Sequence, residues 1–351
     1  MRKLSDEMLL IRADASVAIG TGHVMRCLAL AQAWQDAGGR VTFVMAESTP
    51  AIEERLRNGG VGLVRIDGAT GSDFDGEQLI ALARTHCPSW VVVDGYEFDA
   101  DYQRALKNER LKVVLIDDNG RAGTYAADVV LNQNIHAQEC LYKNRETYTR
   151  LLLGTKYALL RREFASAKDP RKISSIGSKL LVSMGGSDPD NVTRRVLGAI
   201  EQVAVENLQV VVVAGGSNPH LASVAGSVAK SSHSCRILNN VTNMQELISW
   251  ADLAISAAGT ACWEYCALGL PAVLLAVAEN QIPNAEALHA AGVARLVAGG
   301  SRFSISEMAQ LITRLANSVS ERQALSRTAC TVVDGGGAGR VISTLMGEGA
   351  S

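Results

Sequence analysis

Several compositional signals that assign a protein to a class are missing from this chain. Its 34 Lys and Arg residues nearly balance its 36 Asp and Glu residues, so the formal net charge is −2 and nothing indicates a nucleic-acid partner. No pair of the seven cysteines has zinc-finger spacing, and their odd number argues against a disulfide framework. Cys262 and Cys266 lie close together on a predicted helix, and we interpret them as small core residues rather than metal ligands.

Long apolar segments are also missing. No apolar run approaches the roughly 18 residues that a membrane-spanning helix needs, and the segment Met1–Glu7 lacks the apolar centre of a signal peptide. We therefore expect a cytoplasmic protein. With 351 residues, of which 47 % are hydrophobic and 20 % charged, the chain suits a compact globular protein of about two domains.

Short β-branched runs alternate with amphipathic helical stretches, and this alternation predicts parallel sheets with right-handed crossovers. The irregular segment Ala137–Ser178 interrupts the pattern, which resumes at Lys179. The sequence thus predicts an α/β protein with two Rossmann-like domains facing a cleft, at 1–168 and 176–335, followed by a C-terminal helix within 336–351. Strands are expected in the first domain at Leu9–Arg12, Arg40–Val44, Gly62–Ile66, Trp90–Val93, Lys112–Ile116 and Asp128–Leu131.

A glycine-containing turn, Ala18-Ile-Gly-Thr-Gly-His23, follows the first predicted strand and opens a helix. Gly20 and Gly22 let the backbone turn sharply and bring its N–H groups close to a ligand, and the N-terminus of the helix favours negative charge. The third glycine of the dinucleotide-binding fingerprint is missing from the run that follows His23, which includes Arg26 and Cys27. A dinucleotide oxidoreductase is therefore disfavoured.

His23 stands at the mouth of this turn. A helix N-terminus disfavours the imidazolium cation, so a neutral His23 is suited to accepting a proton. Asp14, two residues past the predicted strand, either orients the imidazole or caps a turn. Asp94 and Asp117 follow two further strands, where parallel sheets bind ligands, although each can equally cap the turn that it begins.

Two glycine pairs follow strands in the second half of the chain. The turn Met184-Gly-Gly-Ser-Asp-Pro189 contains Gly185 and Gly186 and resembles a seat for an anion, because bare backbone N–H groups meet a predicted helix N-terminus there. The turn Ala214-Gly-Gly-Ser-Asn-Pro219 is explained by turn chemistry alone.

A third turn runs from Ser256 and opens a helix near Gly259. Its small residues let a diphosphate approach exposed N–H groups, while Glu264, about a turn further on, can accept hydrogen bonds from a ribose diol. A solvent-facing glutamate is the simpler interpretation of Glu264. Downstream, the segment Ala278-Glu-Asn-Gln-Ile-Pro-Asn284 supplies amides suited to sugar hydroxyl and N-acetyl groups.

Seven further segments strengthen a resemblance that the His23 turn begins. They are Arg12-Ala-Asp14, Val93-Asp-Gly-Tyr96, Ile116-Asp-Asp118, Leu131-Asn-Gln-Asn134, Leu153-Gly-Thr-Lys-Tyr-Ala-Leu-Leu-Arg161, Val182-Ser-Met-Gly-Gly-Ser-Asp-Pro189 and Glu279-Asn-Gln281. With the run Ile19–Leu28, these segments resemble the PseG-type nucleotide-sugar hydrolases of pseudaminic acid biosynthesis. That family shares the GT-B architecture with the glycosyltransferase MurG, which the stretch Gly259–Pro271 also resembles.

The resemblance implies hydrolysis of a UDP-linked 2,4-diacetamido-2,4,6-trideoxy sugar with inversion at the anomeric carbon, without a metal or another cofactor. His23 matches the general base of the family and Tyr96 a tyrosine of the sugar site. Glu264 matches the ribose-binding glutamate and Asn280 an amide near the glycosyl-phosphate. The usual Asp-His-Tyr of the family is here Asp94-Gly95-Tyr96, and spore-coat polysaccharide proteins of the same family carry comparable variations.

The predicted site residues fall into three groups. The expected catalytic residue is His23, and the expected substrate contacts are Asp14, Gly20, Gly22, Arg26, Tyr96, Asn280, Gln281 and Asn284. The expected nucleotide contacts are Gly185, Gly186, Ser256, Gly259, Thr260 and Glu264. A glycosyltransferase with a UDP-sugar donor and a non-catalytic nucleotide-sugar binding protein remain the alternatives.

Overall fold

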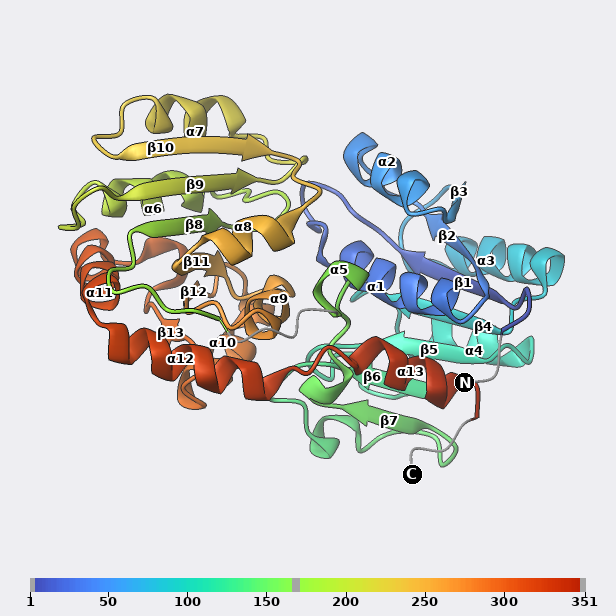
Figure 1. Cartoon of the computed structure of the whole chain (residues 1–351). Helices are drawn as coiled ribbons and strands as arrows, with labels where there is room; N and C mark the ends of the chain where they lie inside the picture. The colour runs from blue at the N-terminus through green and yellow to red at the C-terminus, as the bar shows by residue number, and fades with distance from the viewer. Residues whose placement is uncertain (1–3, 166–170, 348–351) are drawn as a thin grey trace. The chain divides into compact units, whose positions relative to one another are not determined.

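A computed structural model describes residues 4–165 and 171–347 of the chain (Figure 1). The chain divides into two compact units. Unit 1 comprises Met1–Arg162 and Gly335–Ser351, and unit 2 comprises Glu163–Asp334. Each unit is built on one sheet of parallel strands with helices between them, so the predicted α/β class is confirmed.

The sheet of unit 1 has seven strands in the order β3-β2-β1-β4-β5-β6-β7. The strands are β1 (Met8–Ala13), β2 (Arg40–Met45), β3 (Gly62–Arg65), β4 (Trp90–Asp94), β5 (Val113–Ile116), β6 (Val129–Asn132) and β7 (Arg150–Leu153). The helices are α1 (Gly22–Asp36), α2 (Pro50–Asn58), α3 (Asp73–His86), α4 (Ala100–Asn108) and α13 (Gly337–Leu345), with short 3₁₀ helices η1 (Glu139–Tyr142) and η2 (Thr155–Tyr157). The short α5 (Arg162–Ala165) begins where the chain leaves unit 1.

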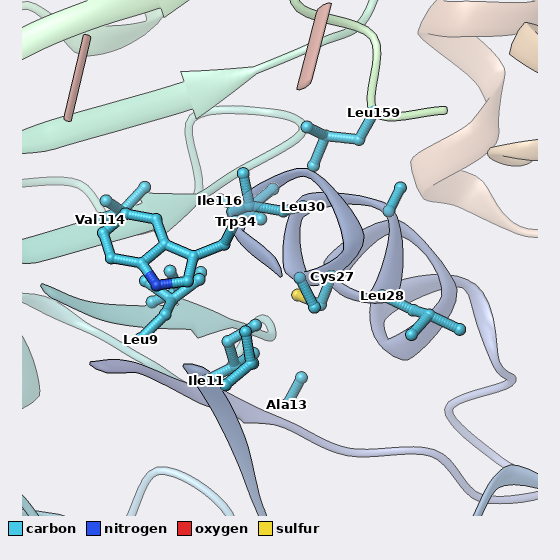
Figure 2. Packing of buried hydrophobic residues seen from close by; sticks show 14 of the residues in the cluster. Leu9, Ile11, Ala13, Cys27, Leu28, Leu30, Trp34, Val114, Ile116 and Leu159 are labelled. Atoms are coloured by element: carbon cyan, nitrogen blue, oxygen red, sulfur yellow. The ribbon is translucent and has the colours of Figure 1, made fainter. Parts of the chain in front are cut away.

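Helix α1 is covered by the core of unit 1 along most of its length (Figure 2). Trp34 is fully buried with Ile11 of β1 and Ile116 of β5 in one apolar cluster. The indole N–H of Trp34 donates to the carbonyl of Glu7 at 3.0 Å, which satisfies the only polar group of a large apolar side chain. This packing fixes the axis of α1, and hence the position of its first turn, relative to the sheet.

The sheet of unit 2 has six strands in the order β10-β9-β8-β11-β12-β13. The strands are β8 (Lys179–Ser183), β9 (Gln209–Ala214), β10 (Ser234–Asn239), β11 (Leu253–Ala257), β12 (Ala272–Leu275) and β13 (Arg295–Leu296). The helices are α6 (Val192–Ile200), α7 (Leu221–Val228), α8 (Met244–Trp250), α9 (Ala261–Ala267), α10 (Ile282–Ala290), α11 (Ile305–Asn317) and α12 (Val319–Val332), with η3 (Glu279–Gln281) and η4 (Gly300–Arg302). Among the helices of residues 4–165 and 171–347, none combines the length and the apolar character that crossing a bilayer demands.

The segment Ala137–Ser178 is less irregular than the sequence predicted. It contains β7, an edge strand whose three consecutive leucines show no alternation with polar residues. Part of the predicted linker lies outside the described residues. In the part that follows, Arg171 donates to the carbonyl of Ile248 at 2.7 Å, and Arg322 donates to that of Ser174 at 2.6 Å. The last residues before β8 are therefore bound to unit 2.

The helix predicted within the last segment of the chain is observed as α13, and it packs against α1. Three of its side chains, Val341, Ile342 and Leu345, belong to the same apolar cluster as Trp34. The indole N–H of Trp90 donates to the carbonyl of Leu345 at 3.0 Å. Helix α13 is therefore part of the core of unit 1.

Gly337 and Gly339, both in α13, give the first testable prediction. A Cβ on Gly337 would lie 2.2 Å from the carbonyl oxygen of Ala158, whereas a Cβ on Gly339 would meet no atom within 4 Å. We expect Gly337→Ala to lower the free energy of unfolding by about 1–3 kcal/mol, because backbone must move. Gly339→Ala is the matched control and should be neutral or stabilising by up to about 1 kcal/mol. Urea denaturation measures both, and equal stabilities would contradict the packing of α13.

Both sheets have a topological switch point, where the chain leaves one strand toward one side and returns to the other side. In unit 1, β1 connects outward to β2 and β3, and β4 pairs with β1 on its other edge. In unit 2, β8 and β11 have the same relation. Ligands of open parallel sheets bind at the carboxyl ends of such strand pairs. The residues beyond β1 and β4, and beyond β8 and β11, are therefore the candidate binding sites.

Candidate functional site

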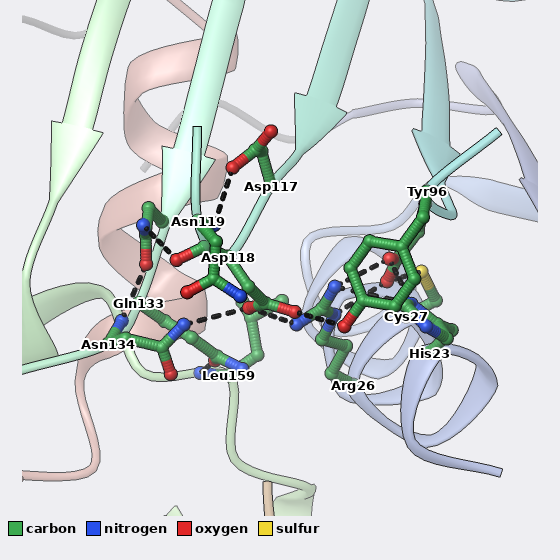
Figure 3. A network of polar contacts seen from close by, with 12 residues as sticks. His23, Arg26, Cys27, Tyr96, Asp117, Asp118, Asn119, Gln133, Asn134 and Leu159 are labelled. Carbon is green, nitrogen blue, oxygen red and sulfur yellow. Dashed lines mark hydrogen bonds and ion pairs between the residues drawn. The ribbon is translucent and has the colours of Figure 1, made fainter. Parts of the chain in front are cut away.

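The switch point of unit 1 carries a histidine–carboxylate pair (Figure 3). His23 is the second residue of α1, and Asp94 is the last residue of β4. The Nδ1 atom of His23 lies 2.6 Å from Oδ1 of Asp94, and both side chains are buried. An ionised carboxylate only accepts hydrogen bonds, so Nδ1 carries the hydrogen, and in the neutral imidazole Nε2 has the lone pair. This arrangement leaves Nε2 able to accept a proton.

Arg26 follows His23 by three residues in α1, and it is buried. Its guanidinium donates to both oxygens of Asp94, from Nε at 2.7 Å and from Nη2 at 2.6 Å. Its third group, Nη1, donates to Oδ1 of Asp118 at 2.7 Å. The sequence predicted Arg26 as a substrate contact. In the structure its guanidinium bridges two carboxylates and holds Asp94 and Asp118 in place.

The carboxylates of Asp94 and Asp118 both form an ion pair with Arg26. Burial raises the pKa of Asp94, but the charge of Arg26 and the contacts to His23 lower it more, so that the pKa lies well below its ordinary value. Burial likewise raises the pKa of Asp118, and the charge and hydrogen bond of Arg26 again outweigh it and lower the pKa. Both groups are therefore ionised at neutral pH.

Tyr96 stands at the solvent side of this network. Its ring meets the His23 ring edge-on with the centroids 5.1 Å apart, and the residue is 39 % exposed. Its hydroxyl donates to Oδ2 of Asp118 at 3.2 Å (Figure 3). Asn134, in the loop after β6, donates to Oδ1 of Asp118 at 2.8 Å. Asp118 and Asn134 lie in the motifs Ile116-Asp-Asp118 and Leu131-Asn-Gln-Asn134, but the sequence pattern assigned neither residue a role.

Asp14 does not contact His23 in this structure, which corrects the idea that it orients the imidazole. Its carboxylate accepts hydrogen bonds from the backbone of Ala46 at 2.8 Å and of Glu47 at 3.0 Å. It also accepts from Thr70 at 2.6 Å and from Arg12 at 2.7 Å. The contacts with Ala46, Glu47 and Thr70 join the end of β1 to the loops after β2 and β3. Asp14 is buried and shapes the loops at this edge of the sheet.

The loop between Asp14 and α1 is a tight turn. The N–H of Gly20 donates to the carbonyl of Ser16 at 2.9 Å, and Gly20 has a φ of +81° that favours glycine. Gly22 is the first residue of α1, and the first turn of that helix contains no acidic residue. The first backbone N–H groups of a helix have no intrahelical acceptor. This turn can therefore receive an anionic or hydroxyl group beside His23.

The switch point of unit 2 carries the turn from β11 into α9. A Cβ on Gly259 would lie 3.9 Å from the side-chain nitrogen of Gln281, so this turn and the loop after β12 adjoin. The side-chain oxygen of Gln281 accepts from the backbone of Val277 at 3.1 Å, which fixes its amide. Thr260 directly precedes α9, and Glu264 lies one turn into it, half-buried. The carboxyl edge of this sheet therefore combines a turn of small residues, whose backbone is accessible, with polar side chains that are held in place.

Ser256, which the sequence predicted as a nucleotide contact, has a buried side chain in the structure. Its hydroxyl donates to the carbonyl of Ser183 at 2.9 Å and accepts from the hydroxyl of Tyr265 at 3.2 Å. It is buried and joins β11 to β8. Asn280 is half-buried in η3, and Asn284 is buried in α10 with its side-chain oxygen lacking a hydrogen-bond partner among the described residues.

The two glycine pairs of unit 2 pack against each other. A Cβ on Gly215 would lie 2.1 Å from the carbonyl oxygen of Gly186, so only glycine fits there. Gly185 has a φ of +92° and open space above it. Asp188 accepts from the backbone of Val192 at 2.7 Å, and α6 accordingly begins at Val192 rather than at Pro189 as predicted. Gly185 thus remains accessible beside the β11 turn.

Comparison with known proteins agrees with this division of the chain. Residues 180–332 match the glycosyltransferase family 28 C-terminal domain. The spore coat polysaccharide biosynthesis protein SpsG of Bacillus subtilis is 27 % identical over 70 % of this chain and 73 % of its own length. A UDP-2,4-diacetamido-2,4,6-trideoxy-beta-L-altropyranose hydrolase of Campylobacter jejuni is 24 % identical over 72 % of this chain and 85 % of its own length. The uncharacterized protein MJ1062 of Methanocaldococcus jannaschii is 25 % identical over 75 % of this chain, but the match spans about half of that relative, 54 %.

Solved structures share the fold at low identity. MurG of Acinetobacter baumannii has a TM-score of 0.65 and 17 % identity, and the match covers 97 % of this chain and 99 % of that chain. The spinosyn rhamnosyltransferase SpnG has a TM-score of 0.65 and 15 % identity, covering 97 % of this chain and all of that chain, 100 %. The protein therefore has the GT-B fold, matches the glycosyltransferase family 28 C-terminal domain in unit 2, and is related to a UDP-sugar hydrolase and to a spore-coat polysaccharide protein.

Proposed function

We propose that this protein hydrolyses a UDP-linked 2,4-diacetamido-2,4,6-trideoxy sugar and releases UDP and the free sugar, as a step in pseudaminic acid or surface polysaccharide biosynthesis. The observation that carries the proposal is the 2.6 Å contact between His23 Nδ1 and Asp94. It leaves Nε2 as a proton acceptor at the first turn of α1. The relationship to a hydrolase with this class of substrate supports the same assignment.

The chemistry requires a base and a stabilised leaving group. Water attacks the anomeric carbon, a C–O bond forms, and the water proton passes to Nε2 of His23. The bond from the anomeric carbon to the phosphate oxygen breaks, and its electron pair leaves with UDP. UDP is already anionic, so it needs hydrogen-bond donors rather than a strong general acid. Attack on the face opposite UDP inverts the anomeric configuration.

We assign the nucleotide to unit 2. Backbone N–H groups at Gly259 and Thr260 would donate to the diphosphate. Gly185 is exposed after β8, the strand that pairs with β11. Glu264 would accept hydrogen bonds from the ribose hydroxyls. Gln281 and Asn280 would contact the glycosyl-phosphate, and the proposal requires no metal ion or other cofactor.

Glu264→Ala is expected to weaken UDP binding about ten- to a hundredfold, because a hydrogen bond to a charged group contributes roughly 1.5–3 kcal/mol. Isothermal titration calorimetry with UDP measures the change. Glu206→Ala is the matched control, since Glu206 is exposed in the loop before β9, at the opposite edge of the sheet. Equal UDP affinity in Glu264→Ala and the wild-type protein would refute the ribose assignment.

The reaction itself is tested with UDP-2,4-diacetamido-2,4,6-trideoxy-β-L-altropyranose in oxygen-18 water. We expect UDP release with one oxygen-18 atom in the sugar, which mass spectrometry detects. Oxygen-18 in UDP would instead indicate cleavage of the P–O bond. No release of UDP from this sugar or from related UDP-diacetamido sugars would refute the hydrolase assignment.

Glycosyl transfer is the second candidate, because the family that matches residues 180–332 is a glycosyltransferase domain. A transferase would use the same donor but a hydroxyl group of an acceptor in place of water. It would release UDP rapidly only when an acceptor is added. Release of UDP in buffer alone, at a rate independent of added sugar acceptors, distinguishes hydrolysis from transfer.

A further inference from the structure

Asp118 collects hydrogen bonds from three different elements. It accepts from Arg26 of α1 at 2.7 Å, from Asn134 after β6 at 2.8 Å and from the hydroxyl of Tyr96 after β4 at 3.2 Å. Its side chain is 12 % exposed. The backbone of Asp118 is held as well, because its carbonyl accepts from Asn132 at 2.8 Å. The carboxylate therefore has a fixed position and orientation.

An ionised carboxylate has no hydrogen to offer, so the Tyr96 hydroxyl must be the donor in its contact with Asp118. Burial raises the pKa of Asp118, but the charge of Arg26 lowers it more and keeps the group ionised. The single hydrogen of the Tyr96 hydroxyl is then used within the protein. Toward a ligand, the Tyr96 oxygen can act only as a hydrogen-bond acceptor.

His23, like Tyr96, donates its hydrogen to a carboxylate of the protein. Asp94 takes the hydrogen of Nδ1, and Nε2 is left as an acceptor. The rings of His23 and Tyr96 adjoin edge-on with centroids 5.1 Å apart. Two carboxylates, Asp94 and Asp118, thus give two neighbouring side chains the same polarity, and Arg26 bridges those carboxylates. The ligand that complements a pair of acceptors is a molecule with two hydrogens to donate.

We propose that Asp118 is a positioning residue that fixes the Tyr96 hydroxyl as an acceptor, so that His23 and Tyr96 together hold the attacking water by its two hydrogens. This inference rests on the proposed hydrolysis. A water molecule bound in this way keeps an oxygen lone pair free for the anomeric carbon, and the hydrogen on Nε2 of His23 is the one transferred. The same polarity repels a phosphate from this position, so the leaving group must find its donors elsewhere.

A double-mutant cycle tests whether Asp118 acts through the Tyr96 hydroxyl. Tyr96→Phe removes only that hydroxyl, and Asp118→Asn removes the negative charge that orients it. With UDP-2,4-diacetamido-2,4,6-trideoxy-β-L-altropyranose, we expect each single variant to lower kcat about 10- to 100-fold, with KM changed less than about threefold. The double variant should be no more than about threefold slower than the slower single variant, because both changes disable one contact.

Asp117→Asn is the matched control. Asp117 adjoins Asp118 in the chain, but its carboxylate accepts from Asn119, Gly120, Tyr125 and Tyr142, which shapes the loop after β5. Its effect on kcat should multiply with that of Tyr96→Phe. Multiplication of the Asp118→Asn and Tyr96→Phe effects, or an unchanged kcat in Tyr96→Phe, would overturn the proposal.

A second measurement needs no substrate and separates this proposal from the proposed function. In protein labelled with [ζ-¹³C]tyrosine, the Tyr96 resonance is the one missing from Tyr96→Phe. We expect Asp118→Asn to shift that resonance, because the ring carbon senses the acceptor of its hydroxyl, while Asp117→Asn leaves it in place. An unshifted resonance overturns the role of Asp118 even in an active enzyme. A wild-type protein that releases no UDP overturns the proposed hydrolysis and, with it, the water-binding role.

Discussion

His23→Asn is expected to hydrolyse UDP-2,4-diacetamido-2,4,6-trideoxy-β-L-altropyranose about 10²–10⁴-fold more slowly than the wild-type enzyme, which is the usual contribution of a general base. The asparagine amide retains polarity and approximate size, but it cannot take the proton of the attacking water. UDP affinity should stay nearly constant, because the nucleotide is assigned to unit 2. Steady-state kinetics and calorimetry with UDP measure the two quantities.

The pH dependence gives an independent check on His23. Wild-type activity should decline on acidification, because a protonated imidazole has no lone pair for the water proton, and this acid limb should be absent in His23→Asn. His86→Asn is the control, since His86 is exposed at the end of α3, at the amino edge of the sheet. Near-normal turnover in His23→Asn would show that the base lies elsewhere.

Arg26→Met should lower the free energy of unfolding by about 3–5 kcal/mol at neutral pH, because two buried carboxylates lose their shared cation. The contrast is Arg57→Met in α2, where the arginine is 63 % exposed beside Glu53 and its loss should cost less than about 1 kcal/mol. Urea denaturation across a pH series measures both variants. A loss below about 1 kcal/mol in Arg26→Met would contradict the buried ion-pair network.

The difference in free energy of unfolding between the wild-type protein and Arg26→Met should depend on pH. In the wild-type protein the pKa values of Asp94 and Asp118 are lowered, so their ionisation stabilises the fold above the unfolded pKa of about 4 and this stabilisation is lost as the pH falls through the folded values. Arg26→Met removes the cation that lowers both pKa values, so both pKa values rise, and protonation relieves the two charges on acidification. The stability difference between the proteins should therefore narrow as the pH falls toward about 4.

The α/β class and the strands other than β7 and β13 were predicted from the sequence. Runs such as Val91-Val-Val93 are β-branched and flanked by turn residues, and they appear where expected. The edge strand β7 was not predicted, because Leu151-Leu-Leu153 has neither alternation nor β-branching. The two-residue β13 gives even less signal. Local pattern therefore identified the strands rich in β-branched residues, and it missed one strand made of leucines and one strand of two residues.

The site was harder to predict because its contacts are distant in sequence. Both Asp14 and Asp94 follow strands, and Asp14 is the nearer to His23 along the chain. The structure selects Asp94, because β4 pairs directly with β1 and its last residue faces the start of α1. Asp117 and Asp118 divide similarly between turn capping and the network of Arg26. Strand order decides these choices, and it cannot be derived from spacing.

The return of α13 to the first sheet has a consequence for biosynthesis. Unit 2 is one uninterrupted stretch of chain, whereas the core of unit 1 contains side chains from both ends of the sequence. A ribosome delivers Val341 and Leu345 only after every residue of unit 2 has emerged. Trp90 and the face of α1 that α13 covers therefore remain without their packing partner until a helix that is synthesised after all of unit 2 becomes available. Termination of translation before α13 is made would leave that apolar face exposed, so that chaperones and proteases could bind it.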